Sequence, residues 1–124
     1  MNELTDFRER LAAILADALA NDVGVFDAIP DSIAPPAVFI TWANPWMINF
    51  TWCDFVAQVQ LIVVAQRIEP GGQYGVLEDL VTQLLGILRE NKLALRDVTS
   101  PYPIVLGGVD YLAASINIVQ DMGA

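Results

Sequence analysis

The sequence predicts an α+β fold: a mostly antiparallel sheet of four to five strands with two helices packed on one face, in the order α-β-β-β-α-β-β. Three observations lead to this prediction. Two segments repeat their apolar residues at spacings of three and four, as amphipathic helices do. Other segments, rich in valine and isoleucine, alternate apolar and polar residues, as half-buried strands do. The strands outnumber the helices and follow one another in hairpins, which favours an antiparallel or mixed sheet over a doubly wound one.

The length and composition of the chain bound what it can be. With 124 residues it has the size of one domain, and we expect residues 1–124 to form a single unit. Apolar residues make up 55% and charged residues only 17%, so a monomer would leave apolar surface in water, which oligomerisation would cover. Three prolines interrupt the charge-free run between Ser32 and Cys53, so no membrane-spanning helix is expected.

The first helix is expected over about residues 4–20, where apolar residues recur on one face. Thr5 or Asp6 would cap its start. A short strand at residues 23–26 follows, and the prolines and aspartates of residues 27–36 indicate an irregular surface connection. We interpret the helix as packing one face against the sheet.

A second strand is expected at residues 37–42, and Asn44-Pro45 indicates a turn that closes it. All the tryptophans of the chain, at positions 42, 46 and 52, lie around this turn, together with Met47. Aromatic residues dominate both protein cores and protein interfaces. The cluster is therefore interpreted as a core layer, as a subunit interface or, as a further alternative, as the lining of a small-ligand pocket.

The longest predicted strand covers residues 55–66, and the rest of the chain is organised around it. Its odd-numbered positions are apolar, while Gln58, Gln60 and Gln66 share the other side. We expect the apolar side to lie under the helices, and Gln58 with Gln60 to face a neighbouring subunit or the interior of an assembly. At ~3.3 Å per residue the strand spans roughly 40 Å, so we expect it to extend past the edge of a small domain.

A glycine-rich segment, residues 67–75, joins this strand to the second helix. Its glycine spacing matches neither the dinucleotide-binding nor the P-loop pattern, and Glu78 and Asp79 follow where an anion would bind. We therefore expect a loop that reaches a neighbouring subunit. The helix is expected over about residues 75–91, with acids in its first turns and bases in its last, as the helix dipole favours.

The C-terminal third is expected to form strands joined by hairpins. Residues 93–98 and 104–106 are strand-like and are interrupted by Ser100-Pro101-Tyr102-Pro103. Gly107-Gly108 then indicates a tight turn into a long strand at residues 109–119. Two antiparallel C-terminal strands would result.

Several kinds of chemistry are missing from the sequence. The net charge of −9 opposes a tight grip on nucleic-acid phosphates. The absence of histidine excludes histidine-dependent triads and histidine-ligated metals. Lys92, the only lysine, falls at a predicted helix end, so no Ser-Lys pair is expected; Cys53, the only cysteine, excludes an internal disulfide and is expected to be buried. We predict no enzyme activity, no cofactor and no metal site, and the acidic first residues predict a cytosolic protein.

The order of these elements resembles the tail terminator proteins of long-tailed bacteriophages, a family also described as minor tail or head-to-tail joining proteins. The resemblance rests on organisation and not on an invariant motif. It covers nearly the whole chain: the N-terminal helix, the hairpin from Trp42 to Cys53 that leads into residues 55–66, the loop from Arg67 to Gly72, the helix at residues 74–91 and the closing strand at residues 109–119.

The resemblance implies a structural virion protein that forms a homohexameric ring, caps the tail tube, ends its polymerisation and provides a docking surface for the head. The implied partners are further copies of the chain, the tail tube protein and a head connector or stopper protein. DNA would pass through an acidic lumen without specific binding, and no membrane is involved. The protein would reside in the host cytoplasm during assembly and then in the tail or neck of the virion. The family supplies no catalytic residue.

The predicted interface with other subunits or with the tail tube draws on the aromatic cluster, the polar side of the long strand and the glycine-rich loop. Its residues are Trp42, Trp46, Met47, Trp52, Gln58, Gln60, Arg67, Glu69 and Tyr74. Two alternatives stay open: another neck, connector or tail-tube component and, from a different class, a small-ligand-binding domain that uses the tryptophans.

Overall fold

The structure of the chain is a computed structural model, in which residues 3–19, 23–26, 28, 36–49, 55–67 and 75–121 are described. The α+β class predicted from the sequence is confirmed. Along the described residues the elements are α1 (Glu3–Ala18), β1 (Gly24–Phe26), β2 (Ala37–Asn49), β3 (Phe55–Arg67), α2 (Gly75–Glu90), β4 (Ala94–Val98), β5 (Tyr102–Leu106) and β6 (Val109–Asp121).

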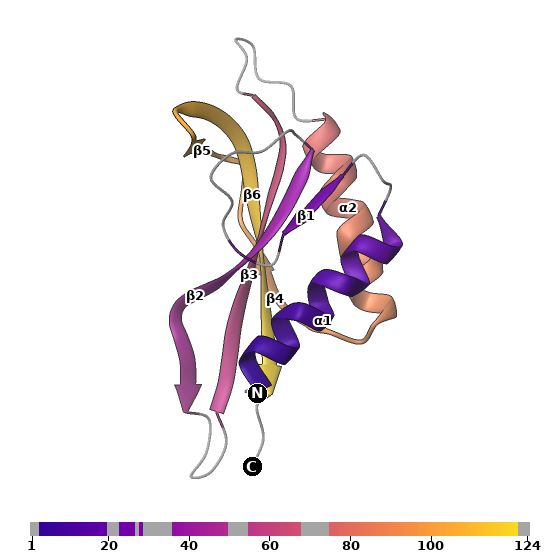
Figure 1. The fold of residues 1–124 in the computed structure, drawn as a ribbon, viewed down its shortest axis with the longest axis vertical. Coiled ribbons are helices and arrows are strands. Elements are labelled where there is room, and N and C mark those ends of the chain that lie inside the picture. The colour runs from indigo at the N-terminus through magenta and orange to yellow at the C-terminus, as the bar shows by residue number, and fades with distance from the viewer. Residues whose placement is uncertain are drawn as a thin grey trace.

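The described strands form one six-stranded sheet in the order β1-β2-β3-β6-β4, with β5 also paired to β6 (Figure 1). The short pairing of β1 with β2 is parallel, and the other described pairings are antiparallel. The sheet has more strands than the four or five that the sequence predicts. The reason is that β4 and β5 are separate strands, which pair with different parts of β6.

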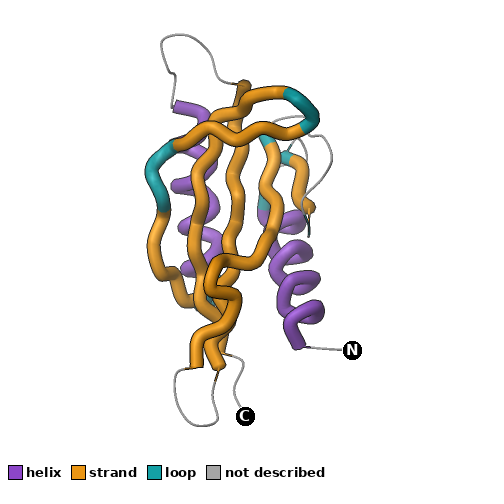
Figure 2. The backbone as a smooth tube through the Cα atoms, turned by 90° about the vertical axis from the view of Figure 1, so that its left-hand side faces the viewer, coloured by secondary structure: helices purple, strands orange, loops and turns teal. Residues whose placement is uncertain are grey.

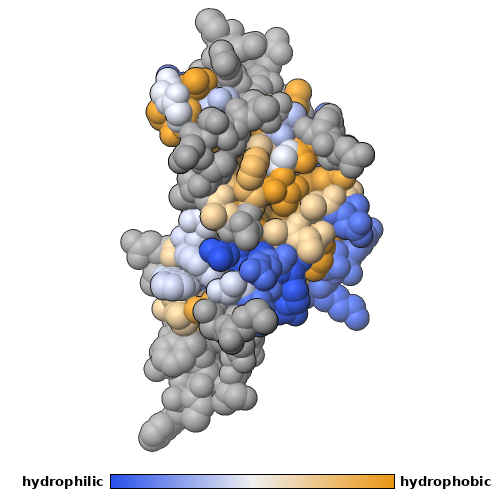
Figure 3. Space-filling view, viewed as in Figure 1, coloured by the Kyte–Doolittle hydropathy of each residue, from blue (hydrophilic) through white to orange (hydrophobic). Residues whose placement is uncertain are grey.

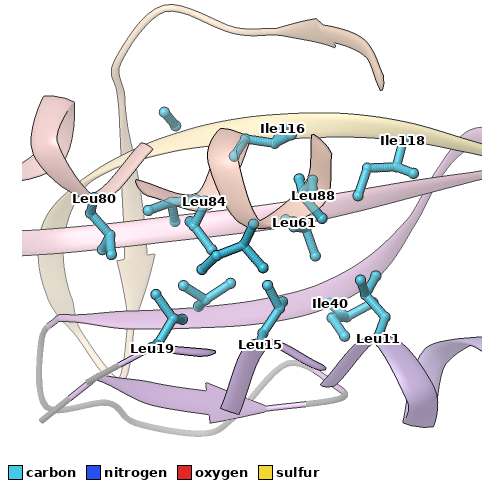
Figure 4. Close-up of a cluster of buried hydrophobic side chains, with 14 of the residues drawn as sticks. Leu11, Leu15, Leu19, Ile40, Leu61, Leu80, Leu84, Leu88, Ile116 and Ile118 are labelled. Carbon is cyan, nitrogen blue, oxygen red and sulfur yellow. The ribbon is translucent and has the colours of Figure 1, made fainter. Parts of the chain in front are cut away.

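Both helices cover one face of the sheet, as predicted (Figures 1 and 2). Val59, Leu61 and Val63, on the odd-numbered side of β3, are fully buried beneath them, which confirms the predicted orientation of this strand. Figure 4 shows side chains of both helices meeting Leu61 and the isoleucines of β6 in one cluster. Burial of one leucine or isoleucine side chain stabilises a fold by about 1.5–3 kcal/mol, so this helix-side core holds the layers together.

The predicted end of the second helix at Asn91 and Lys92 is confirmed. The N–H of Leu93 donates to the carbonyl of Leu88 at 3.0 Å, and the N–H of Lys92 donates to the carbonyl of Arg89 at 3.1 Å. Lys92 itself has a left-handed backbone with φ 58°. These two bonds and the left-handed residue are the features of a Schellman helix end.

β2 continues where the sequence predicts a turn. The strand runs through Asn44-Pro45, so the predicted turn at this dipeptide is wrong. Trp42 pairs with Val59 and Met47 pairs with Ala57, so five steps along β2 match two steps along β3. The extra residues form a bulge, which accommodates a proline that has no N–H to donate to the sheet.

β5 and the start of β6 form a hairpin that folds over the other face of the sheet, where it crosses in front of the remaining strands in Figure 2. It covers a second, smaller core that includes the buried Ile62 and Tyr111. The hydroxyl groups of Tyr102 and Ser115 are hydrogen-bonded to each other, which ties β5 to β6. We call this hairpin, residues 102–113, the β5 cover.

Part of β5 falls where the sequence predicts an interruption between strands. Tyr102 and Pro103 belong to β5. Among the described strands β5 pairs only with β6, and an edge strand tolerates a proline because not every N–H is needed for pairing. The tight turn predicted at Gly107-Gly108 is confirmed, since the two glycines have φ values of 58° and 78°.

Candidate subunit interface

Three of the predicted interface residues lie together on β2. Trp42 is half-buried and packs against the helix-side core, while Trp46 and Met47 keep 46% and 38% of their surfaces exposed. The rings of Trp42 and Trp46 lie with centroids 5.3 Å apart and planes tilted by 39°, an ordinary geometry for an aromatic pair. Trp46 lies in the bulge of β2, where regular strand pairing is interrupted. We call Trp42, Trp46 and Met47 the tryptophan surface.

Gln58 is not on the surface of the single chain, contrary to the expectation that it faces a neighbour. It is 2% exposed, and Arg96 Nη1 donates a hydrogen bond to its Oε1. Arg96 lies in a bulge of β4, between Leu95 and Asp97, and its side chain reaches past β6 to β3. Burial removes the amide of Gln58 from water, and Arg96 replaces water as its donor.

Gln60 lies in a row of polar residues that crosses four strands. The register pairs Thr41 with Gln60, Gln60 with Asn117, and Asn117 with Asp97. Because paired residues of an antiparallel sheet point to the same face, these side chains lie together on the face opposite the helices, toward the viewer of Figure 2. We call Thr41, Gln60, Asn117 and Asp97 the polar row.

Not every polar atom of the polar row has a hydrogen-bond partner among the described residues. Asn117 Nδ2 donates to Asp97 Oδ1, and Arg96 Nε lies 3.7 Å from Asp97 Oδ2. Both side chains of this ion pair are about half exposed, so the pair stabilises the fold by at most ~1 kcal/mol. Asn117 Oδ1 is buried and accepts no hydrogen bond from the described part of the chain. A donor from a partner would therefore be favourable at this point.

The face that carries the polar row is close to neutral. Arg96 and Asp97 are the only charged residues among the described side chains of β2, β3 and β4, and their charges cancel. Acids such as Glu78 and Asp79 lie on the helices, which cover the other face. The negative charge of the chain is therefore not concentrated on the uncovered face of the sheet.

The other predicted interface residues lie partly or wholly outside the described residues. Arg67 ends β3 and pairs with Tyr111, but its side chain is not described. Trp52, Glu69 and Tyr74 lie outside the described residues altogether, as does Cys53, which the sequence predicts to be buried.

Two residues that the sequence reasoning missed are Arg96 and Val105. Arg96 is the only base after Lys92, but the sequence gives no signal that it contacts Gln58, because only the pairing of β4 with β6 brings the two side chains together. Val105 is 62% exposed on the outer side of β5, with Tyr102 and Ile104 on the inner side. The residues of β5 are all apolar or aromatic, so the sequence alone does not show which of their side chains point outward.

The described residues contain no other arrangement that suggests chemistry. No three acids or cysteines among them gather as metal ligands, and none of their helices is long and apolar enough to cross a membrane. Apolar side chains gather over the helices beside a hydrophilic region (Figure 3). A shallow, open depression on α1 is lined by Ala13, Ile14, Ala16 and Asp17, but one helix face does not enclose a ligand.

The chain matches no protein-family model and no curated protein. The tryptophan surface, the polar row and Val105 are therefore interpreted from their own geometry and chemistry.

Proposed function

We propose that the chain is a structural protein of a bacteriophage virion that assembles into a hexameric ring on the finished tail tube. The ring caps the tube, ends its polymerisation and presents a docking surface to the head. The partners in this role are other copies of the chain, the tail tube protein and a head connector or stopper protein. The protein acts first in the host cytoplasm and then in the tail or neck of the virion.

The observation that carries the proposal is the exposure of large apolar side chains on separate parts of the fold. Trp46 and Met47 are exposed on β2, Val76 on α2, Val98 on β4 and Val105 on β5. Each square ångström of apolar surface left in water costs about 25 cal/mol, which favours covering these side chains. A closed ring gives every subunit two neighbours, which can cover more than one exposed region.

The element order supports the same proposal. The chain runs from a helix through three strands to a second helix and then to the C-terminal strands, which is the organisation on which the resemblance to tail terminators rests. Both helices lie on one face of the sheet, so the other face is available to line a channel below the β5 cover.

The polar row is our candidate for the channel lining. Its amide and hydroxyl groups bind water, and its single acid is balanced by Arg96. Such a lining presents no cluster of lysine or arginine side chains to the DNA phosphates, so DNA passes through the channel without being bound. In this proposal the lumen is neutral, in place of the acidic lumen expected from the net charge of the chain.

The exposed tryptophan favours an interface over a ligand pocket. The ring of Trp46 lies tilted beside that of Trp42, and Trp46 keeps almost half of its surface in contact with solvent. Ligand pockets bury most of the surface of what they bind, whereas protein interfaces gather exposed aromatic anchors.

The oligomeric state and the tail phenotype test the proposal. Native mass spectrometry and electron microscopy of the purified protein should show rings of six subunits, alone or on isolated tail tubes. A strict monomer at high concentration that also fails to bind tail tubes would overturn the proposal. Deletion of the gene should give tails of irregular length, whereas tails of normal length without heads would indicate a neck component instead.

A further inference from the structure

We infer that the β5 cover is a hinged lid, which lifts from the sheet as a unit while the helix-covered half of the molecule stays folded. The cover lies over the smaller of the two cores, on the face opposite the helices (Figure 2). We call this core the second core, and its buried residues are Phe39, Ile62, Val64, Tyr111 and Ala113. Such a lid is a property of the single chain and does not require the ring.

The chain enters the cover through an interruption of the regular strand pairing. Thr99 follows β4 and lies opposite Ser115 of β6. The N–H of Thr99 donates to the carbonyl of Ser115 at 2.9 Å, and the N–H of Ser115 donates to Oγ1 of Thr99 at 3.0 Å. In a regular antiparallel pair a backbone carbonyl would accept this second bond, so a side chain replaces it here. Ser100 and Pro101, which follow, are exposed and lie between strands, where the backbone can turn.

The chain leaves the cover beside a bulge. Val64 of β3 pairs with Ala113, and Gln66 pairs with Leu112, so two steps along β3 match one step along β6. The extra residue, Ala65, bends its strand and interrupts the ladder. Beyond it only the last two residues of β3 pair with the cover. Both ends of the cover are therefore irregular beside the same short part of β6, where a hinge needs local changes of backbone angle.

Side-chain contacts hold the cover shut across this hinge. Tyr102, the first residue of β5, shares a hydrogen bond between its hydroxyl group and that of Ser115. Ser115 is 2% exposed and pairs with Ile62, so it belongs to the fixed sheet. Ile104 and Leu106 pack on the second core and stay half-buried. We call the hydrogen bond between Tyr102 and Ser115 the latch.

Lifting the cover changes the chemistry of the uncovered sheet face. Phe39, Ile62 and Val64 lie on the same face of β2 and β3 as the polar row, because strand residues two positions apart share a face. They are buried in the closed form and would reach water beside Gln60 in the open form. A lifted hairpin of two strands is only marginally stable, so β5 also separates from β6 once the cover opens. The closed cover thus prevents association through this apolar face, and a partner that binds there favours the open form.

Thiol labelling at two neighbouring positions of β3 tests the inference. Val63 and Val64 are both fully buried, but Val63 lies beneath the helices and Val64 lies beneath the cover. Cys53, the only native cysteine, is replaced by serine, and the variants Val63→Cys and Val64→Cys are each reacted with the thiol reagent DTNB. The Val64→Cys thiol should react at least ~10-fold faster, because it needs only local opening. Its rate should also depend weakly on low concentrations of urea, since local opening exposes little surface.

Urea denaturation of each variant gives the labelling rate that global unfolding alone would allow. A Val64→Cys thiol that reacts no faster than this rate would overturn the inference, as would equal labelling of both thiols at equal stability. Ile62→Cys repeats the measurement at a second position beneath the cover and replaces Val64→Cys if that variant does not fold.

Removal of the latch identifies what keeps the lid closed. Ser115→Ala and Tyr102→Phe each delete one hydroxyl group, and each should raise the labelling rate of Val64→Cys about 5–10-fold without changing that of Val63→Cys. The combined change should be no faster than the faster single change, because both delete the same hydrogen bond. Thr82→Ala deletes a hydroxyl group from the exposed side of α2 and is the matched control, with no effect on either rate.

Three results would contradict the latch. Unchanged labelling of Val64→Cys in both hydroxyl variants would show that the bond does not hold the cover. Fully additive effects would show that the two hydroxyl groups act separately. An equal rise at Val63→Cys would show that the substitutions weaken the whole fold and not the cover alone.

Discussion

Arg96, on the edge strand β4, supplies a hydrogen bond to Gln58, which is buried on β3. Gln58 is buried on β3, and the guanidinium of Arg96 donates to its amide oxygen from β4. A hydrogen bond from a charged donor is worth more than a neutral one, and loss of Arg96 would remove that donor from a buried acceptor. The pair therefore contributes to stability although Arg96 itself is half exposed.

Arg96→Ala should lower the free energy of unfolding by about 1–3 kcal/mol, because the Gln58 amide then stays buried without its donor. Urea denaturation monitored by tryptophan fluorescence measures the change. Arg89→Ala, on the exposed side of α2, is the matched control and should change the free energy by less than ~0.5 kcal/mol. Equal stability of the two variants would show that the Arg96 hydrogen bond makes no net contribution to the free energy of unfolding.

Gln60→Lys should impair ring assembly while the monomer stays folded. Gln60 is half-buried in the polar row, where a longer charged side chain can reach water in the monomer, whereas in a ring the added lysines of all subunits would repel one another across the channel. Analytical ultracentrifugation measures assembly, and thermal unfolding measures the monomer. Thr82→Lys, exposed on α2, should leave both unchanged. Unfolding of the Gln60→Lys monomer would show instead that this face is core.

At the scale of single residues, the sequence predicts orientation better than burial. The alternation of β3 correctly places Val59 and Leu61 under the helices and Gln58 on the other side. It does not predict that Gln58 is buried, because its donor Arg96 is 38 positions away and reaches it only through the pairing of β4 with β6. Burial of a polar residue depends on such distant partners, which a local pattern does not contain.

At the scale of elements, β2 and α2 behave differently for a physical reason. The helix is specified by local spacing and end signals, so its start and end are close to those predicted. β2 depends on its pairing with β3. A proline in the sequence has the same local signature whether it closes a strand or lies in an edge bulge, and only the distant partner strand distinguishes the two.

Gly86→Ala should stabilise α2. A Cβ at this exposed position meets nothing within 4 Å, and alanine favours a helix interior over glycine by about 1 kcal/mol. Thermal unfolding should therefore show a higher melting temperature. Gly108→Ala is the matched control: it also meets nothing within 4 Å, but φ +78° strains an alanine, so its melting temperature should fall. A rise in both variants would contradict the assigned turn geometry.

At the scale of the whole molecule, the distribution of charge is more informative than its sum. The net charge of −9 suggests a uniformly acidic protein, yet the described side chains of the uncovered sheet face are balanced. The sequence alone predicts the sum but not this separation, because the position of Arg96 beside Asp97 on one face follows from the bulge in β4. The proposed channel lining depends on that balance.

Asp97→Asn should create weak, salt-sensitive retention of DNA by assembled rings, because it leaves Arg96 unbalanced on each subunit of the lining. Fluorescence anisotropy with a labelled duplex at low salt measures retention, and the wild-type ring should show none. Asp79→Asn makes the same change of charge on α2 and should remain without effect. Equal retention by both variants would place the polar row outside the channel.

The two faces of the sheet carry separate cores, so we expect one part of the molecule to open locally while the other opens only on global unfolding. Among the described strands, β5 pairs only with β6, and it packs on the smaller core, whereas β3 is paired on both sides with long strands and lies beneath both helices. Amide protons of β5 should therefore exchange with deuterated water through a local opening, well before those of β3, which need global unfolding. A subunit built in this way can let one end adjust to a neighbour while its helix-covered half keeps a fixed shape.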